Sequence, residues 1–204
     1  MGSKGESMKH LMSLALISTL SPLAQATPLE IDPAHTSVGF EIKHLVVSTV
    51  HGNFADFNGK VEWNEKDITQ SNIQFTVKVD SINTSNAKRD GHLRSPDFFD
   101  TAKYPTAEFK SSRITSKGKN KYLLEGDLTL HGISKPTRFE MLFLGKAKDP
   151  YGVEKLMFQA STELVRKDFG LTYNAVLESG GLALGEKVKL IVDAQAAPVV
   201  ISAK

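Results

Sequence analysis

The sequence predicts an all-β, antiparallel domain with one short helical segment. Apolar and polar residues alternate along most of the chain, in segments separated by Gly, Pro, Asn and Asp. Alternation of this kind is typical of strands with one buried face. Short Gly-containing connections at 130–136 and 148–152 indicate hairpins, and therefore antiparallel pairing. Such strands fit either a closed barrel or a two-sheet sandwich, and alternation alone does not separate the two.

The first residues are expected to be a secretory signal peptide rather than part of the fold. A basic flank precedes a short apolar run at 11–20, and Ala24 and Ala26 supply small residues at the spacing that a signal peptidase accepts. The run is shorter than the ~20 residues of a membrane span. We therefore expect cleavage after Ala26, upstream residues and signal peptide over 1–26, one domain over 27–204, and export to the periplasm.

The composition and motifs exclude several classes of protein. The 204 residues contain no cysteine, so disulfides and cysteine metal sites are absent. The formal net charge is only +2, whereas a nucleic-acid-binding protein usually carries a strongly basic surface. Histidines occur without a His-x-His or His-Glu-x-x-His motif, so no metal site and no cofactor is expected, although His44 and His51 could meet across a bend. Without a nucleophile elbow or a phosphate loop, no catalytic residue is predicted.

Strands are expected wherever apolar residues share one parity. Glu140, Glu163 and Asp127 fall on the opposite parity, where they would face solvent. The apolar members are, in chain order, Val38, Phe40 and Ile42; Val61 and Trp63; Ile73, Phe75, Val77 and Val79; Ala107 and Phe109; Leu124, Leu128 and Leu130; Phe158, Ala160 and Leu164; and Val188, Leu190 and Val192.

A single helical stretch is expected between Ser85 and Phe99. Ser85 is a favourable N-cap for a first helix that ends at Arg94, and Gly91 weakens the middle of that helix. A second short turn is expected to start at Ser95 with proline at its first position.

This stretch has two interpretations. Arg89 and His92 lie close in sequence to Phe98, which suits a pocket rim with apolar rings facing inward and cationic groups facing the polar end of a ligand. The same residues suit a helix that plugs a barrel end, with the phenylalanines in the core and Arg89 paired with Asp90 or Asp97.

The inward parity is rich in phenylalanine. This side chain offers apolar surface without a hydrogen-bonding group, so it suits a lipid-tail site as well as a packed core. The residues alone therefore predict an exported antiparallel barrel or sandwich that is either packed or holds an apolar ligand. The large inward aromatics are Phe40, Phe75, Phe109, Phe139, Phe143 and Phe158.

Several motifs occur in a fixed order between Leu29 and Asp193. They are Ile31-Asp32-x-x-His35-Thr36-x-Val38-x-Phe40-x-Ile42-x-His44, Gly52-x-Phe54-x-Asp56-Phe57-x-Gly59, Arg89-Asp90-x-His92-Leu93-Arg94-Ser95-x-Asp97-Phe98-Phe99, Lys103-Tyr104-Pro105-x-Ala107-x-Phe109 and Gly126-Asp127-Leu128-Thr129-Leu130-x-Gly132. Together they resemble the YceI-like family of bacterial secreted proteins.

The resemblance implies an extended, lipocalin-like antiparallel β-barrel of about eight strands, a number consistent with a lumen for one small ligand. Family members enclose a long apolar molecule, and no enzymatic activity is implied. We therefore expect a periplasmic carrier or sequestering protein for a polyisoprenoid, an isoprenoid quinone or a fatty-acid amide. The expected partners are this isoprenoid or other long-chain lipid, an envelope membrane or membrane protein as donor or acceptor, and a second copy in a homodimer, but no nucleic acid.

Two other functions stay open at this point. One is an enzyme that acts on a lipid-linked substrate with His44 or His92 as acid/base, and the other is a protein-interaction module with a packed interior. The resemblance supplies no catalytic signature, so ligand-binding residues are predicted from parity and motif position. They are Val38, Phe40, Ile42, His44, Phe54, Phe57, Phe75, Val77, Arg89, His92, Phe98, Phe99, Phe109, Phe139, Met141, Phe143 and Phe158.

Overall fold

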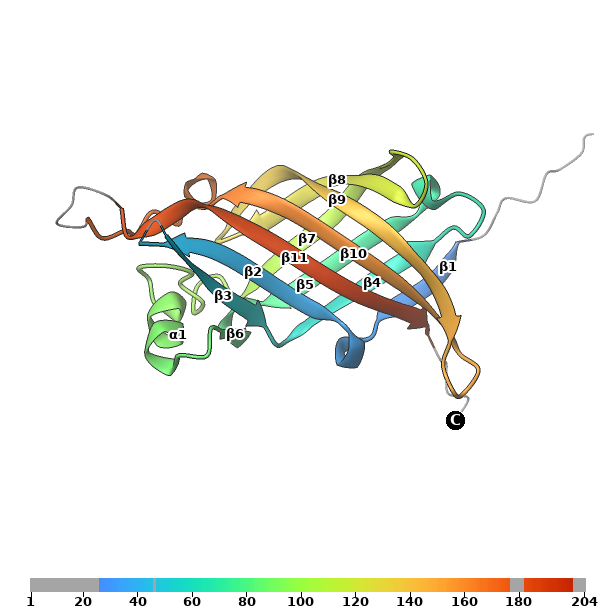
Figure 1. The fold of residues 1–204 in the computed structure, drawn as a ribbon, viewed down its shortest axis with the longest axis horizontal. Coiled ribbons are helices and arrows are strands. Elements are labelled where there is room, and N and C mark those ends of the chain that lie inside the picture. Colours follow the sequence, from blue (N-terminus) through green and yellow to red (C-terminus); the bar gives the residue numbers. More distant parts are fainter. Residues whose placement is uncertain (1–25, 46, 177–181, 200–204) are drawn as a thin grey trace, which may run out of the picture.

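The fold is a closed, antiparallel β-barrel (Figure 1). The structure is a computed structural model that describes residues 26–45, 47–176 and 182–199, so the expected signal peptide lies, apart from Ala26, outside the described residues. Eight strands form the ring, and β11 pairs with β1 to close it. In ring order they are β1 (Thr27–Ile31), β4 (Phe57–Trp63), β5 (Asn72–Lys78), β7 (Thr106–Ser116), β8 (Lys121–Leu130), β9 (Ile133–Lys148), β10 (Glu154–Val165) and β11 (Leu184–Pro198).

The closure settles the choice between barrel and sandwich in favour of the barrel. Leu29 pairs with Pro198 and Ile31 with Ala196, so segments from the two ends of the domain complete one sheet. Both expected hairpins are present, because β8 is paired with β9 and β9 with β10 through short turns. The lipocalin-like architecture that the resemblance implied is therefore confirmed.

Three further strands extend the sheet at one end of the barrel. Residues 184–193 of β11 pair with β2 (Ser37–His44), β2 pairs with β3 (Ser48–Phe54), and β3 pairs with β6 (Ile82–Asn83). Short 3-10 helices lie between strands, namely η1 (Pro33–His35), η2 (Ile68–Gln70), η3 (Val79–Ser81) and η4 (Arg166–Phe169).

The one α-helix of the described residues, α1 (Ala87–Arg94), lies at the end of the molecule opposite to β1 (Figure 1). The helix is where the sequence predicted it, but its N-cap is Asn86, whose side chain accepts a hydrogen bond from the Arg89 amide at 3.0 Å. The prediction of Ser85 as the N-cap was wrong. Ser85 lies one residue before the cap and has a left-handed backbone with φ of 61°, whereas the capping residue Asn86 is extended. None of the helices in the described part of the chain has the length and apolarity of a membrane span.

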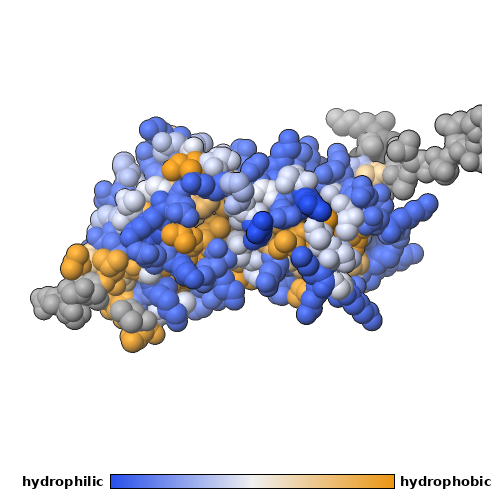
Figure 2. Space-filling view, turned by 90° about the horizontal axis from the view of Figure 1, so that it is seen from above, coloured by the Kyte–Doolittle hydropathy of each residue, from blue (hydrophilic) through white to orange (hydrophobic). Residues whose placement is uncertain are grey.

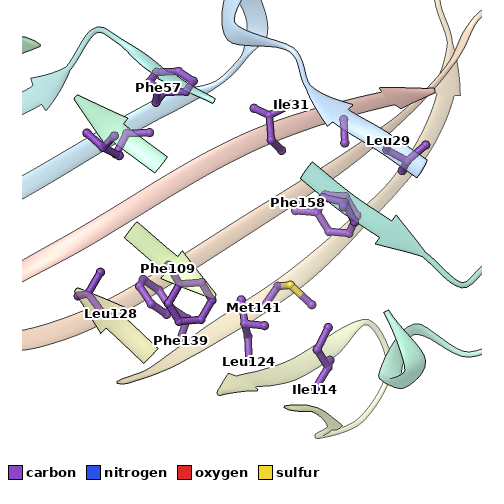
Figure 3. Close-up of a cluster of buried hydrophobic side chains, with 14 of the residues drawn as sticks. Leu29, Ile31, Phe57, Phe109, Ile114, Leu124, Leu128, Phe139, Met141 and Phe158 are labelled. Atoms are coloured by element: carbon purple, nitrogen blue, oxygen red, sulfur yellow. The ribbon is translucent and has the colours of Figure 1, made fainter. Parts of the chain in front are cut away.

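The end of the barrel that contains β1 is filled with side chains, and we call it the packed end. Trp63 lies 5.3 Å from Phe143 and 5.6 Å from Phe158 between ring centroids. Leu29 and Leu156 are almost completely buried beside them. Figure 3 shows buried apolar side chains from several strands, among them Leu29, Ile31 and Phe158, inside the barrel. Hydrophobic burial at this end therefore contributes strongly to the stability of a chain that has no disulfide.

Candidate ligand-binding site

Beyond the packed end the barrel is hollow. A cavity of about 440 Å³ extends toward α1, a size within the range of small-molecule sites. Its wall is overwhelmingly apolar, with a small number of polar side chains that include His44, Arg89, His92, Arg166 and Tyr173. The space is suited to an apolar ligand that makes few polar contacts.

Strand geometry places the lining side chains. Because successive residues of a strand face opposite sides of the sheet, alternate residues of β2, β5, β8 and β11 face the cavity. Phe40 and Leu190 point inward and are nevertheless only half-buried, unlike Leu29 and Leu156 at the packed end. Inward-facing apolar side chains that keep accessible surface indicate an open lumen rather than a packed core.

Gly52 allows the Phe40 ring to lie against the barrel wall. It is the cross-strand partner of Phe40, and a Cβ atom at Gly52 would lie 2.3 Å from the Phe40 Cζ. Phe40 also contacts Phe54 with ring centroids 5.6 Å apart, and Phe54 lies 6.3 Å from Phe99. A continuous aromatic surface therefore runs from β2 to the turn that follows α1.

The structure places most of the predicted site residues around this one cavity. Their role in binding a ligand stays a prediction. Those that line it are Val38, Phe40, Ile42, His44, Phe54, Phe75, Val77, Arg89, His92, Phe98, Phe99, Phe109, Phe139, Met141 and Phe158.

Two predicted residues lie outside the cavity lining. Phe57 is buried in the core, where its ring stacks on Phe75 with centroids 5.7 Å apart. Phe143 packs against Trp63 at the packed end, beside a register shift between β9 and β10. Both belong to the core, Phe57 behind the cavity-lining Phe75 and Phe143 between strands of the packed end.

Arg89 fastens the start of α1 to the preceding strand. Its Nε donates to Thr84 Oγ1 and its Nη2 to the Thr84 carbonyl oxygen, both at 2.7 Å. Asp90 is buried and accepts hydrogen bonds from the Thr84 amide and hydroxyl. The expected pairing of Arg89 with Asp90 or Asp97 is absent among these described residues, since the Nε and Nη2 atoms of Arg89 are directed to Thr84 instead.

An aromatic cluster of His92, Phe98 and Tyr173 lies at the rim of the cavity. The His92 ring centroid is 4.9 Å from those of Phe98 and Tyr173, and Phe98 and Tyr173 are 4.7 Å apart. His92 Nε2 lies 3.1 Å from Asp97 Oδ2, which fixes the ring. We call this cluster the mouth cluster. The cluster joins the α1 region to the segment after η4. The role of this stretch as the rim of a ligand pocket stays a prediction.

Arg166 is a lining residue that the sequence analysis missed. It is 4% exposed, and it donates from Nε to Gly185 O at 2.9 Å and from Nη1 to Leu171 O and Tyr173 O at 2.5 and 2.8 Å. Burial lowers the pKa of its guanidinium, while the charge of nearby Glu186 acts in the opposite direction. A signal was present, since Arg166 continues the inward parity of Leu164 at the end of β10.

Other lining residues were missed because they are aliphatic or lie in loops. Most of the aliphatic ones lie at strand positions that alternation predicts to be buried, Ile31, Val50, Leu184 and Ala194 lie in strands outside the predicted alternation, and loop residues follow no parity. They include Ile31, Val50, Val61, Ile73, Leu93, Ala107, Leu124, Leu128, Leu130, Ala160, Leu164, Phe169, Leu171, Tyr173, Leu184, Val188, Leu190, Val192 and Ala194.

His44 and His51 do not meet across a bend. His44 lines the cavity, whereas His51 lies on the other face of the hairpin, 3.6 Å from Glu41. Within residues 26–45, 47–176 and 182–199, no group of three or more His, Cys, Asp or Glu side chains is arranged to hold a metal ion.

Exposed apolar side chains surround the same end of the barrel. We call Leu45, Val47, Tyr173, Val176 and Leu182 the apolar collar; Val47 and Val176 are 87% and 78% exposed. A hydrogen bond from the Leu45 amide to Ala183 O, 2.8 Å long, joins the two loops that carry the collar. Figure 2 shows hydrophobic residues gathered at this end of the molecule.

Known proteins share this architecture. The YceI-like domain family matches residues 29–196. A UPF0312 protein of Photorhabdus laumondii is 39% identical over 154 residues, which cover 76% of this chain and 80% of the relative. The structure of the Campylobacter jejuni YceI protein has a TM-score of 0.67 and 32% identity, over 81% of this chain and 95% of that chain. A polyisoprenoid-binding domain from Saccharophagus degradans shares the fold, with a TM-score of 0.61 and 17% identity over 83% and 98% of the two chains.

Proposed function

Because the chain belongs to the YceI-like family and its barrel is hollow, we propose that it binds a long apolar lipid in the cavity and carries or sequesters it. The observation that carries this proposal is the set of half-buried, inward-facing apolar side chains, such as Phe40 and Leu190. These side chains gain burial when an apolar chain fills the lumen. Each 100 Å² of apolar surface removed from water contributes about 2.5 kcal/mol before the entropy cost of association.

The ligand class that we propose is a polyisoprenoid, with an isoprenoid quinone and a fatty-acid amide as the alternatives to compare. Two observations support this class. The related domain from Saccharophagus degradans is described as polyisoprenoid-binding, and the cavity wall here consists mainly of aliphatic and phenylalanine side chains. Branched, unsaturated chains have the same apolar character as this wall.

We further propose that the protein works in the periplasm and exchanges its ligand with the envelope membrane through the open end. The sequence of residues 1–26 supports export. The apolar collar supports membrane exchange, because it is continuous with the cavity through Tyr173 and offers a lipid a path that avoids water. A membrane protein and a second copy of the chain are the competing partners for this collar.

A binding role is proposed in preference to catalysis or protein recognition. An enzyme would use His44 or His92 as acid/base, and both border the cavity, but the rest of the wall is overwhelmingly apolar and favours binding of an apolar chain. The cavity argues against the packed interior that a pure interaction module would have.

Binding of farnesol by the delipidated protein, measured by titration calorimetry, tests the proposal. Leu190 faces the cavity from β11 and Lys189 precedes it on the outer face, so the same new residue can be placed inside or outside. We expect Leu190→Glu to remove farnesol binding while Lys189→Glu retains it, with circular dichroism confirming that both variants are folded. Equal binding by a folded Leu190→Glu protein would exclude the cavity as the site.

A further inference from the structure

Arg166 has a buried donor atom that the protein does not use. Its Nη2 is the only buried side-chain nitrogen or oxygen without a hydrogen-bond partner in the described part of the chain. The other donors of the guanidinium are engaged, since Nε and Nη1 bind the carbonyl oxygens of Gly185, Leu171 and Tyr173. Leaving a buried polar group unpaired is unfavourable, and such groups are rare in folded proteins.

Arg166 belongs to the wall of the cavity. Leu164 and Arg166 both line the cavity, and they occupy successive inward positions at the point where β10 ends. The mouth cluster is close, because Tyr173 belongs to it and accepts a hydrogen bond from Arg166. Arg166 therefore lies near the mouth, whereas the apolar wall continues inward to Phe158 beside the packed end.

The guanidinium of Arg166 also has no carboxylate of the described residues within ion-pair distance. Arg166 takes part in none of the ion pairs formed by the described residues. Glu186, the acidic residue whose charge acts on it, is exposed and forms its ion pair with Lys167. Arginine keeps its charge in proteins, so this wall contains a buried cation that an anion would stabilise.

We propose that Arg166 binds the polar end of the ligand, that this end carries an anionic oxygen group, and that the apolar chain extends from it toward the packed end. The inference rests on the proposed lipid-binding function and specifies the headgroup. Carboxylates and phosphates share the required chemistry, since their oxygens accept charge-assisted hydrogen bonds from a guanidinium. Nη2 is covered in the structure, so the headgroup reaches it when the side chains that cover it move aside.

The test compares ligands that differ only at the polar end. Palmitate is compared with methyl palmitate, and farnesyl phosphate with farnesol, by titration calorimetry on the delipidated wild-type protein. We expect each anion to bind at least about tenfold more tightly than its neutral counterpart, because hydrogen bonds to charged groups are stronger than neutral ones. A gain for palmitate alone identifies a carboxylate site, and a gain for farnesyl phosphate alone identifies a phosphate site.

Two variants assign the effect to Arg166. Arg166→Gln is expected to bind acid and ester equally, while Arg113→Gln, which changes an exposed arginine of β7 outside the cavity, keeps the wild-type preference. Arg166 also donates to three backbone carbonyl groups, so Arg166→Gln could fail to fold. A second measurement on the wild-type protein therefore avoids this variant. In wild-type protein, the carboxyl group of bound ¹³C-palmitate, followed by NMR, should titrate at lower pH than that of palmitate in micelles. The reason is that a nearby cation lowers the pKa of a carboxyl.

The outcomes separate this inference from the proposed function. Equal affinity of wild-type protein for the charged and neutral members of both pairs overturns the anion site but leaves lipid binding intact. Failure of all four ligands to bind contradicts both proposals. A preference for anions that persists in a folded Arg166→Gln protein shows that another group binds the headgroup and overturns the assignment to Arg166.

Discussion

The Nη1 atom of Arg166 donates a hydrogen bond of 2.8 Å to the carbonyl oxygen of Tyr173, whose ring packs against His92. The buried arginine at the end of β10 therefore positions one of the rings that border the mouth of the cavity. The opposite ring comes from α1, which Arg89 fastens to Thr84. Two arginines thus fix the two sides of the mouth, and the contact between those sides is an aromatic cluster that can separate without breaking the barrel.

Removal of the Tyr173 ring should accelerate ligand exchange. Tyr173→Ala deletes two aromatic contacts, each contributing about 0.5–1.5 kcal/mol, from a side chain that is already partly exposed. We expect the dissociation rate of a bound lipid to rise several-fold in stopped-flow measurements, with little loss of global stability. Tyr151→Ala, at an exposed tyrosine in the β9–β10 turn, is the control. An unchanged rate in Tyr173→Ala would show that the mouth cluster does not limit exchange.

The close contact of Gly52 with Phe40 should make this glycine sensitive to a methyl group. Gly52→Ala places a Cβ 2.3 Å from Phe40 Cζ, so the ring must move into the cavity. We expect a loss of about 1–3 kcal/mol in the free energy of unfolding, together with weaker lipid binding. Gly39→Ala is the matched control, because its Cβ would have no neighbour closer than 3.7 Å. Urea denaturation showing equal stability of the two variants would contradict the contact.

Trp63 should be important for stability and unimportant for entry of the ligand. Trp63→Ala leaves a void beside the Phe143 and Phe158 rings at the packed end, and large aromatic truncations in cores cost about 3–5 kcal/mol. Denaturation monitored by circular dichroism measures the loss. A cost below about 1 kcal/mol would mean that this end is not a packed core.

The interactions of Asp32 should stabilise the fold more at neutral than at acidic pH. Partial burial raises the pKa of Asp32, but hydrogen bonds from His35, the Ala34 amide and Lys155 outweigh burial and lower the pKa overall. A carboxyl whose pKa is lower in the folded state stabilises the protein above its unfolded-state pKa, and this contribution is lost as the pH falls through the folded-state pKa.

Comparison of Asp32→Asn with wild-type protein measures this contribution. The difference in unfolding free energy should be present at about pH 7 and should shrink as the pH falls below the ordinary carboxyl pKa of about 3.9. Asp67→Asn, which alters the cap of η2 where Asp32 caps η1, controls for capping. A difference between wild type and Asp32→Asn that stays constant across this pH range would rule out the charge as the cause.

The sequence predicted the strands well because their signal is local. Period-two alternation showed that Phe40, Phe75 and Leu190 share one side of the sheet, and the structure confirms this inward orientation. Closure of the barrel has no local signal, since it depends on pairing Leu29 with Pro198 at opposite ends of the domain. The resemblance to a family supplied that information.

The distinction between core and cavity was beyond the sequence pattern. Phe143 and Phe40 have the same parity and chemistry, yet Phe143 packs on Trp63 whereas Phe40 lines open space. The difference arises from how much side-chain volume the other strands contribute at each level of the barrel. Arg166 was missed for a related reason, because a charged residue at the end of a strand is usually exposed, and its burial depends on carbonyl groups from two later segments.

Native mass spectrometry of the protein purified from a bacterial envelope, before and after challenge with a polyisoprenoid, tests the central claim most directly. A hollow barrel that carries one lipid predicts a mass increment of a single long-chain molecule per protein, released by organic extraction and retained by the Lys189→Glu variant but not by a folded Leu190→Glu variant. The mass of the unliganded chain alone, both before and after the challenge, would contradict the claim.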